Sequence, residues 1–190
     1  CSVGVASGLA SLPVAPPCKE NYGRVGALIA DLSSQHGTPP FSPHVTVLGG
    51  FGDQLDQDQV LARTRALAAQ VAPYRCRVAD VACGSSYFQM VYLRMHKDAP
   101  VLNAHAASVS CFQVAPSSKP AYMPHMSLLY GDLANEVREQ VVEAVAGQHK
   151  DLLVDTEFLV RSFHLYRTDP TDLLMKTWEE VAVFPLSGHE

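Results

Sequence analysis

The sequence predicts an α+β fold with antiparallel sheets, and three observations support this prediction. Segments with helical spacing and segments typical of strands mix without the regular alternation of a parallel α/β protein. The length of 190 residues suits one domain. A ten-residue motif occurs twice, which indicates two related lobes. We therefore expect residues 1–190 to form one domain made of two pseudo-symmetric lobes, each carrying one copy of the motif.

The first half of the chain contains the signals of two helices and four strands. Apolar residues recur at helical spacing over residues 21–34, a pattern that Gly37 ends, and again over residues 59–71. Short β-branched and apolar runs predict strands over residues 9–13, 44–48, 77–82 and 88–95. A Gly-Ser-Ser turn at residues 84–86 connects the last two strands.

The second half shows the same mixture. A helix over residues 100–112 begins at Pro100, because proline is well tolerated in the first turn of a helix. A strand is expected over residues 125–130 and an amphipathic helix over residues 135–149. Two further strands are expected over residues 158–166 and 179–185, with a loop at residues 168–170 between them.

Composition excludes several classes of function. The net charge is −5 and the fourteen Lys and Arg residues are scattered, whereas proteins that bind long nucleic acids usually show a basic face. No apolar run is long enough to span a membrane. Five cysteines without CxxC spacing indicate neither a zinc site nor a disulfide framework, although one disulfide stays open. We expect a cytoplasmic monomer that binds a small anionic molecule, with no long nucleic acid and no membrane as partner.

The repeated motif is the feature that points to chemistry. Residues 41–50 read FSPHVTVLGG and residues 122–131 read YMPHMSLLYG. Both copies follow the pattern aromatic-x-Pro-His-apolar-(Thr/Ser)-apolar-Leu-x-Gly without a gap. The prolines Pro43 and Pro124 suit the entry of a strand, where no backbone donor is needed.

The spacing within each copy places two polar groups together. Side chains at positions i and i+2 of a strand point to the same face, so His44 shares a face with Thr46, and His125 with Ser127. If the lobes face each other, two imidazoles can divide the acid and base roles, and two hydroxyls can donate to phosphoryl oxygens. No acidic cluster lies beside either motif, so neither a metal nor another cofactor is implied. The sequence predicts a metal-independent phosphoesterase.

The remaining histidines are interpreted as structural. A single histidine on a strand is more often structural than catalytic, and the matched ten-residue frame reverses that expectation for His44 and His125 alone. His164, in the segment FHLY, resembles a third copy but lacks the proline and the hydroxyl. The other histidines are His36, His96, His105, His149 and His189.

These motifs resemble the two-histidine phosphoesterase superfamily, and within it the plant-type cyclic phosphodiesterases. The likeness covers most of the chain and includes PHVTV at 43–47, FQMVYL at 88–93, AYMPHMSLLYGDL at 121–133 and KTWEEVAV at 176–183. It implies a bilobal fold in which two antiparallel β-sheets flank a central cleft, with helices on the outside. It also implies hydrolysis of ADP-ribose 1″,2″-cyclic phosphate, a by-product of tRNA splicing, to ADP-ribose 1″-phosphate. Nucleoside 2′,3′-cyclic phosphates would likewise be opened to nucleoside 2′-phosphates.

The resemblance adds two substrate-binding candidates. Tyr130 matches a substrate-contacting tyrosine, although strand alternation turns it away from His125 unless the strand bulges or ends just before it. Phe88 matches an aromatic residue of the base pocket, and its alternative is a phenylalanine of the core. Two departures matter as well. Ala10 stands where the family has a tryptophan in the first strand, which removes a stacking platform unless one is supplied elsewhere. The family also has a cysteine pair of which only Cys111 is present here, so control by a disulfide is not carried over.

Three other functions stay open. A 2′-5′ oligonucleotide phosphodiesterase or ligase would carry basic residues beside the motifs, where only Lys119 is close. A nucleotide-binding module without turnover would have lost a histidine or a hydroxyl, yet all four are present. A ribonuclease-like enzyme that makes cyclic phosphates would need a cation at the phosphate, and none is obvious.

Overall fold

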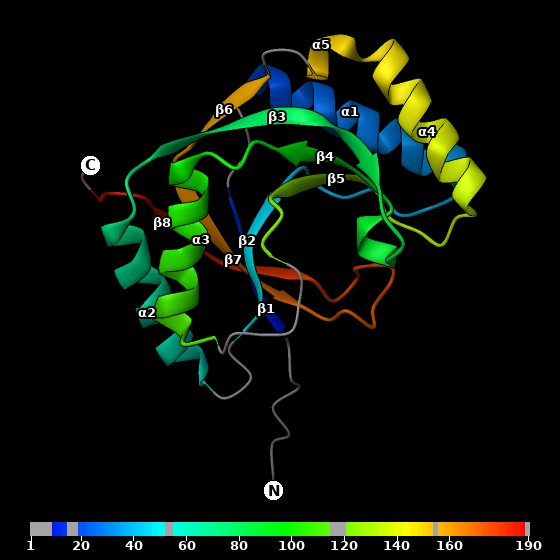
Figure 1. The fold of residues 1–190 in the computed structure, drawn as a ribbon. Coiled ribbons are helices and arrows are strands. Elements are labelled where there is room, and N and C mark those ends of the chain that lie inside the picture. The colour runs from blue at the N-terminus through cyan, green and yellow to red at the C-terminus, as the bar shows by residue number, and fades with distance from the viewer. Residues whose placement is uncertain (1–8, 15–18, 52–54, 115–120, 154–155, 189–190) are drawn as a thin grey trace, which may run out of the picture.

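A computed structural model describes residues 9–14, 19–51, 55–114, 121–153 and 156–188. The elements are β1 (Leu9–Val14), α1 (Lys19–His36), β2 (Val45–Phe51), α2 (Gln57–Gln70), β3 (Tyr74–Cys83), the 3-10 turn η1 (Tyr87–Gln89), β4 (Val91–Met95), α3 (Ala99–Phe112), β5 (His125–Leu129), α4 (Asn135–Gln148), α5 (Lys150–Leu153), β6 (Glu157–Val160), β7 (Ser162–Thr168) and β8 (Glu179–Pro185). Helices and strands therefore mix as expected for an α+β protein (Figure 1).

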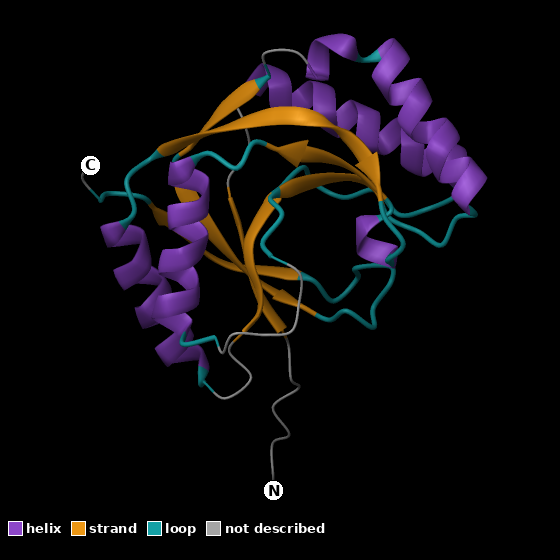
Figure 2. Ribbon diagram, in the orientation of Figure 1, coloured by secondary structure: helices purple, strands orange, loops and turns teal. Residues whose placement is uncertain are grey.

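All eight described strands are hydrogen-bonded in one antiparallel series, which we treat as two four-stranded sheets because a single residue pair joins its halves. The strand order is β6-β3-β4-β5-β2-β1-β7-β8, and every pairing between the described strands is antiparallel. The two sheets meet where β2 pairs with β5 through Val45 and Met126. The expected arrangement of two antiparallel sheets is therefore confirmed, and the structure adds that they are joined through the two strands that carry the motifs (Figure 2).

The helices lie on the outside of the sheets. Helices α2 and α3 pack on the sheet that contains β2, β7 and β8, whereas α1, α4 and α5 pack on the sheet that contains β3, β4 and β5 (Figure 1). The apolar faces of the strands fill the space beneath them, as Phe163 and Leu165 of β7 show. Burying a side chain of this size stabilises the fold by about 1.5–3 kcal/mol.

The prediction of one strand over residues 158–166 is wrong. The segment forms two strands: β6 pairs with β3 in one sheet, and β7 pairs with β1 and β8 in the other. The physical reason is a change in the alternation of buried and exposed side chains, because the buried positions are even-numbered before Arg161 and odd-numbered after it. Phe158 and Val160 are buried, Arg161 is exposed, and burial resumes at Phe163 and Leu165. The chain therefore crosses between the two sheets at Arg161.

The predicted strand over residues 88–95 begins too early. Residues Tyr87–Gln89 form η1, and β4 begins at Val91. The Gln89 amide donates to the Ser86 carbonyl at 2.9 Å, which closes this 3-10 turn. Because neighbouring residues of a strand point to opposite faces, a strand would have separated Phe88 from Gln89. The turn allows both side chains to reach the same pocket.

The other expected elements agree with the structure to within a few residues. None of the helices in the described part of the chain is long and apolar enough to cross a membrane. Cys76, Cys83 and Cys111 are free thiols, while Cys1 and Cys18 lie outside the described residues.

Candidate active site

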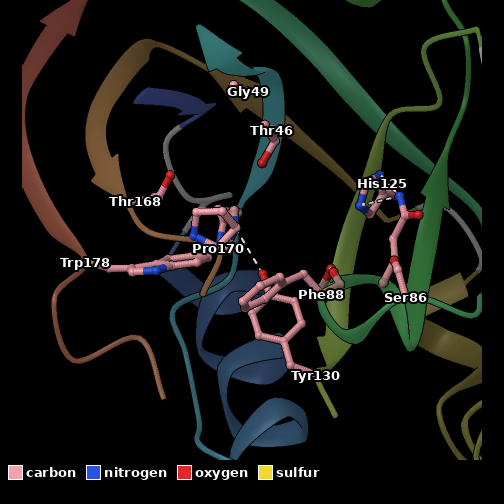
Figure 3. Close-up of a pocket in the computed structure, with 13 residues that line it drawn as sticks. Thr46, Gly49, Ser86, Phe88, His125, Tyr130, Thr168, Pro170 and Trp178 are labelled. Atoms are coloured by element: carbon pink, nitrogen blue, oxygen red, sulfur yellow. Dashed lines mark hydrogen bonds between the residues drawn. The ribbon is translucent and has the colours of Figure 1, made fainter. Parts of the chain in front are cut away.

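The two motif copies lie on the two strands that join the sheets. His44 directly precedes β2 and His125 is the first residue of β5. A pocket of about 280 Å³ opens between the sheets and is lined from both sides (Figure 3). We call it the cleft pocket. Its lining residues are His44, Thr46, Gly49, Gly50, Ser86, Phe88, Gln89, His125, Ser127, Tyr130, Thr168, Pro170 and Trp178.

All six residues proposed from the sequence line the cleft pocket, and the alternation of each strand is the reason for four of them. His44 and Thr46 face the pocket while Val45, between them, is buried on the other side. His125 and Ser127 behave in the same way around the buried Met126. The i, i+2 spacing thus places one imidazole and one hydroxyl at the pocket from each strand.

Each imidazole is oriented by a backbone carbonyl two residues earlier. His44 Nδ1 donates to the Ser42 carbonyl at 2.7 Å, and His125 Nδ1 donates to the Met123 carbonyl at 2.9 Å. A carbonyl oxygen only accepts hydrogen bonds, so Nδ1 carries the proton in both rings. In the neutral form, Nε2 of each histidine is therefore left with a lone pair.

Burial favours this neutral form. It lowers the pKa of His44 below the ordinary histidine value, and the charge of His125 lowers it further, while the bond to Ser42 opposes the change. Burial likewise lowers the pKa of His125, against an opposing bond to Met123. Both groups therefore protonate at lower pH than a histidine in water, which makes either of them available as a base near neutral pH.

Tyr130 reaches the first copy from the second. Strand β5 ends at Leu129, so alternation no longer applies to Tyr130, and its phenol oxygen lies 3.5 Å from Nε2 of His44. The ring stacks on Phe41 with centroids 3.8 Å apart and meets Phe88 edge-on at 5.2 Å. Burial raises the pKa of Tyr130 well above its ordinary value, so the phenol stays neutral and can donate.

The glycine at the tenth position of the motif has a conformational role in both copies. Gly50 has φ +71° and Gly131 has φ +154°, backbone angles that residues with a side chain rarely adopt. A Cβ at Gly131 would also lie 3.2 Å from Cγ2 of Thr38. This backbone turn follows directly after Tyr130, whose side chain lines the pocket.

The aromatic residue at the first position of each copy supports the opposite copy. Phe41 of the first copy stacks on Tyr130 of the second. Tyr122 of the second copy donates from its phenol to the Thr46 carbonyl of the first at 3.0 Å. Its ring stacks on His105 at 3.9 Å, and His105 donates to the Val47 carbonyl at 2.7 Å. The aromatic positions thus hold the two strands in their mutual arrangement.

The two hydroxyls differ in their partners. Ser127 Oγ donates to the Phe88 carbonyl at 3.2 Å and also bonds the Tyr130 phenol. The Thr46 hydroxyl makes no hydrogen bond to the residues that the structure describes, and Figure 3 shows it directed into the pocket. Of these two hydroxyls, that of Thr46 alone has no hydrogen-bond partner among the described residues.

Sequence reasoning missed several side chains of the cleft pocket, and two of them, Gln89 and Trp178, contact residues that were predicted. Gln89 Nε2 donates to Nε2 of His125 at 3.1 Å. The Trp178 indole lies beside Phe88, with ring centroids 5.3 Å apart, and its Nε1 donates to the Asp169 carbonyl at 2.9 Å. Both residues belong to segments that carry the family resemblance, FQMVYL and KTWEEVAV, but no spacing rule relates them to the motifs.

The other histidines in the described residues lie outside the pocket lining. His164 Nδ1 bonds Glu180 Oε2 at 2.7 Å, and its Nε2 lies 3.2 Å from Ser162 Oγ. His36 is the last residue of α1 and His149 follows α4. His189 falls outside the described residues. Within the described ranges, no group of three or more His, Cys, Asp or Glu side chains is arranged to hold a metal ion.

Comparison with known proteins identifies the family of the chain. A profile of the 2′-5′ RNA ligase superfamily matches residues 24–172. The chain is 31% identical over 176 residues to a cyclic phosphodiesterase of Arabidopsis thaliana, and the match covers 90% of this chain and 92% of that protein.

Two solved structures share the fold. The protein TT0787 of Thermus thermophilus superposes with a TM-score of 0.62 at 17% identity, covering 96% of this chain and 100% of that one. LigT of E. coli complexed with ATP gives a TM-score of 0.58 at 13% identity, covering 95% and 98%. At these identities the likeness concerns the arrangement of helices and strands.

Proposed function

The chain belongs to the 2′-5′ RNA ligase superfamily of two-histidine phosphoesterases, and on that premise we propose its substrates and mechanism. It is an enzyme of the cyclic phosphodiesterase type, like its Arabidopsis relative. The proposed reactions are opening of ADP-ribose 1″,2″-cyclic phosphate to ADP-ribose 1″-phosphate, and of nucleoside 2′,3′-cyclic phosphates to nucleoside 2′-phosphates.

The observation that carries the mechanism is the matched pair of imidazoles that line one pocket from two strands, each with Nδ1 held on a backbone carbonyl. One neutral imidazole takes a proton through Nε2 from the water that attacks phosphorus. The other, protonated, gives its Nε2 proton to the leaving ribose oxygen as the phosphorus–oxygen bond of the ring breaks. Placement on two different strands suits the opposite sides of an in-line displacement.

The hydroxyls and the phenol bind the phosphoryl group in this proposal. Thr46 donates to one non-bridging oxygen, and Ser127 donates to another after exchanging its bond to the Phe88 carbonyl. The Tyr130 phenol, which stays neutral, donates to substrate or to His44. The proposed mechanism needs no metal, because the hydroxyls and the phenol would donate to the phosphoryl oxygens.

A nucleobase would stack on the aromatic pair Phe88 and Trp178. The two rings are tilted by 37° at the side of the pocket, and Trp178 is the only tryptophan of the chain. This pair would supply the stacking surface that Ala10 does not offer. Base–aromatic stacking contributes about 1–3 kcal/mol per base.

The size and charge of the cleft pocket favour a small, free nucleotide over an oligonucleotide. Its lining, within the described residues, contains imidazoles, hydroxyls and aromatic rings but no Lys or Arg side chain. Oligonucleotide binding usually relies on a basic track along the backbone. We further propose that the protein acts in the cytoplasm, which the three free thiols of the described residues support, and that it acts as a monomer.

One assay tests this function. The protein would be incubated with ADP-ribose 1″,2″-cyclic phosphate, 2′,3′-cyclic AMP and a 2′-5′ dinucleotide in EDTA, and products would be assigned by phosphorus NMR. We expect the two cyclic phosphates to be opened and the nucleotide product to be the 2′-phosphate. The double variant His44→Ala/His125→Ala is the control. An exclusively 3′-phosphate product, or cleavage of the dinucleotide alone, would contradict the proposal.

A further inference from the structure

The loop between β7 and β8 (residues 169–178), which we call the β7–β8 loop, forms one wall of the cleft pocket. It carries Pro170 and Trp178 into the lining. The loop is stiffened from within, because Asp172 accepts hydrogen bonds from the backbone amide and the hydroxyl of Thr177, both at 2.7 Å. Asp169 accepts from the amide and the hydroxyl of Thr171 at 2.8 and 2.6 Å. The loop can therefore move as a unit that takes Trp178 with it.

Tyr87 bonds this loop from the opposite sheet. It belongs to η1, between β3 and β4, and its phenol donates to the Leu173 carbonyl at 3.0 Å. Its own carbonyl accepts from the Gly131 amide at 3.0 Å, which ties η1 to the end of the second motif copy. Figure 1 shows η1 beside the β7–β8 loop. Tyr87 therefore connects the wall that carries Trp178 to the strand that carries His125.

The tip of the loop has little apolar packing to hold it in this position. Leu173 and Leu174 are 44% and 53% exposed. A hydrogen bond from the opposite sheet consequently matters more here than at a well-packed tip. Tyr87 also packs edge-on against Phe88 at 5.0 Å, and Phe88 lies beside Trp178, so Phe88 connects the Tyr87 ring to the indole.

We propose that Tyr87 is a positioning residue that holds the β7–β8 loop against the cleft and thereby keeps Trp178 in place beside Phe88 to receive a nucleobase. The effect on nucleobase affinity rests on the proposed function, whereas the effect on the position of Trp178 does not. Tyr87 does not line the cleft pocket and does not touch the reacting atoms.

The position of Trp178 can be read without any substrate, because it is the only tryptophan. In Tyr87→Phe, which removes just the hydroxyl, we expect tryptophan emission to shift to longer wavelength and acrylamide quenching to increase. Tyr166→Phe is the matched control: Tyr166 lies on β7, and its phenol bonds Glu180 instead of the loop. A second variant, Asp172→Ala, loosens the loop from within and should change emission and quenching in the same direction.

The kinetic test compares a substrate with a base and one without. For 2′,3′-cyclic AMP, loss of one neutral hydrogen bond should raise KM about two- to ten-fold, with kcat nearly unchanged. The KM for glycerol 1,2-cyclic phosphate, which has no base to stack, should stay at the wild-type value. Circular dichroism would confirm that each variant is folded.

The outcomes distinguish the positioning role of Tyr87 from the proposed cyclic phosphodiesterase function. Emission and quenching of Tyr87→Phe equal to those of the Tyr166→Phe control would overturn the role of Tyr87. Equal losses of kcat on both substrates would also overturn it, because Tyr87 would then support the catalytic groups. If the wild-type protein opens neither cyclic phosphate, the proposed function fails, while the fluorescence comparison still decides whether Tyr87 positions Trp178.

Discussion

The two motif copies are closely matched in sequence, but the bonds around their side chains differ. Both present an imidazole with Nδ1 on a carbonyl two residues earlier. The Thr46 hydroxyl of the first copy has no partner among the described residues, whereas Ser127 of the second already donates to a carbonyl. The ninth position is Gly49 in the first copy and Tyr130 in the second. Sequence symmetry therefore produces two equal imidazoles, and their neighbours make them unequal.

The partners of the two Nε2 atoms show the same inequality. His125 accepts from the Gln89 amide at 3.1 Å, while His44 has the Tyr130 phenol at 3.5 Å. An amide only donates to this neutral nitrogen, whereas a phenol can both donate and accept. Residues outside the repeat, as well as the repeat itself, would therefore divide the acid and base roles between the two imidazoles.

Removing either imidazole should cause the largest loss. We expect His44→Ala and His125→Ala each to lower kcat about 10²- to 10⁴-fold, because each deletes one proton-transfer group. The double variant should be little worse than the poorer single one, since the two act as a unit. Steady-state kinetics with 2′,3′-cyclic AMP measure this. Near-normal turnover in either single variant would show that the matched pair is not the catalytic pair.

Removing either hydroxyl should lower activity, but only one removal should also lower the free energy of unfolding. Thr46→Ala and Ser127→Ala should each lower kcat/KM about ten- to a hundred-fold, the worth of a hydrogen bond to a charged group. Ser127→Ala should also lower the free energy of unfolding by about 1 kcal/mol, because it leaves the Phe88 carbonyl without its bond. Thr46→Ala should leave stability unchanged. Urea unfolding with parallel assays checks both, and equal stability of the two variants would remove the distinction.

The pH profile should reveal the two Nε2 partners. Burial lowers the pKa of both histidines, so the bell-shaped profile of kcat/KM should centre below the ordinary histidine pKa of about 6.5. A bond donated to neutral Nε2 favours the neutral form, and its loss raises the pKa. Gln89→Met should therefore move one limb to higher pH, and Tyr130→Phe the other limb by less. Movement of the same limb in both variants would contradict separate partners for the two histidines.

Chelation should have the smallest effect. Neither copy offers a cluster of metal ligands in the described residues, so EDTA should leave kcat and KM unchanged. Turnover before and after dialysis against EDTA, with Mg²⁺ and Zn²⁺ added back, measures this. A large loss restored by one of these ions would mean that a metal, and not the imidazole pair, activates the water.

Much of the fold was predictable because local patterns dominate it. The spacing of apolar residues predicted helices over residues 21–34 and 135–149. Helix α1 contains the first range, and α4 ends one residue before the second range does. The predicted strand over residues 158–166 failed because an apolar run looks the same whether or not it changes sheets. The point where the chain passes from one sheet to the other is marked by Arg161, where the alternation of buried and exposed residues shifts by one.

Which four side chains face the cleft pocket could be predicted from the sequence alone, because strand alternation is local and the motif occurs twice. The positive φ of the glycine at the tenth position of each copy was not predicted and is seen in the structure. Three contacts become visible only in the folded protein: Gln89 bonds His125, Tyr130 reaches His44, and Trp178 lies beside Phe88. These contacts join segments between 36 and 90 residues apart in the chain, counted from their residue numbers. Packing of the two sheets brings them together, and no local pattern encodes that packing.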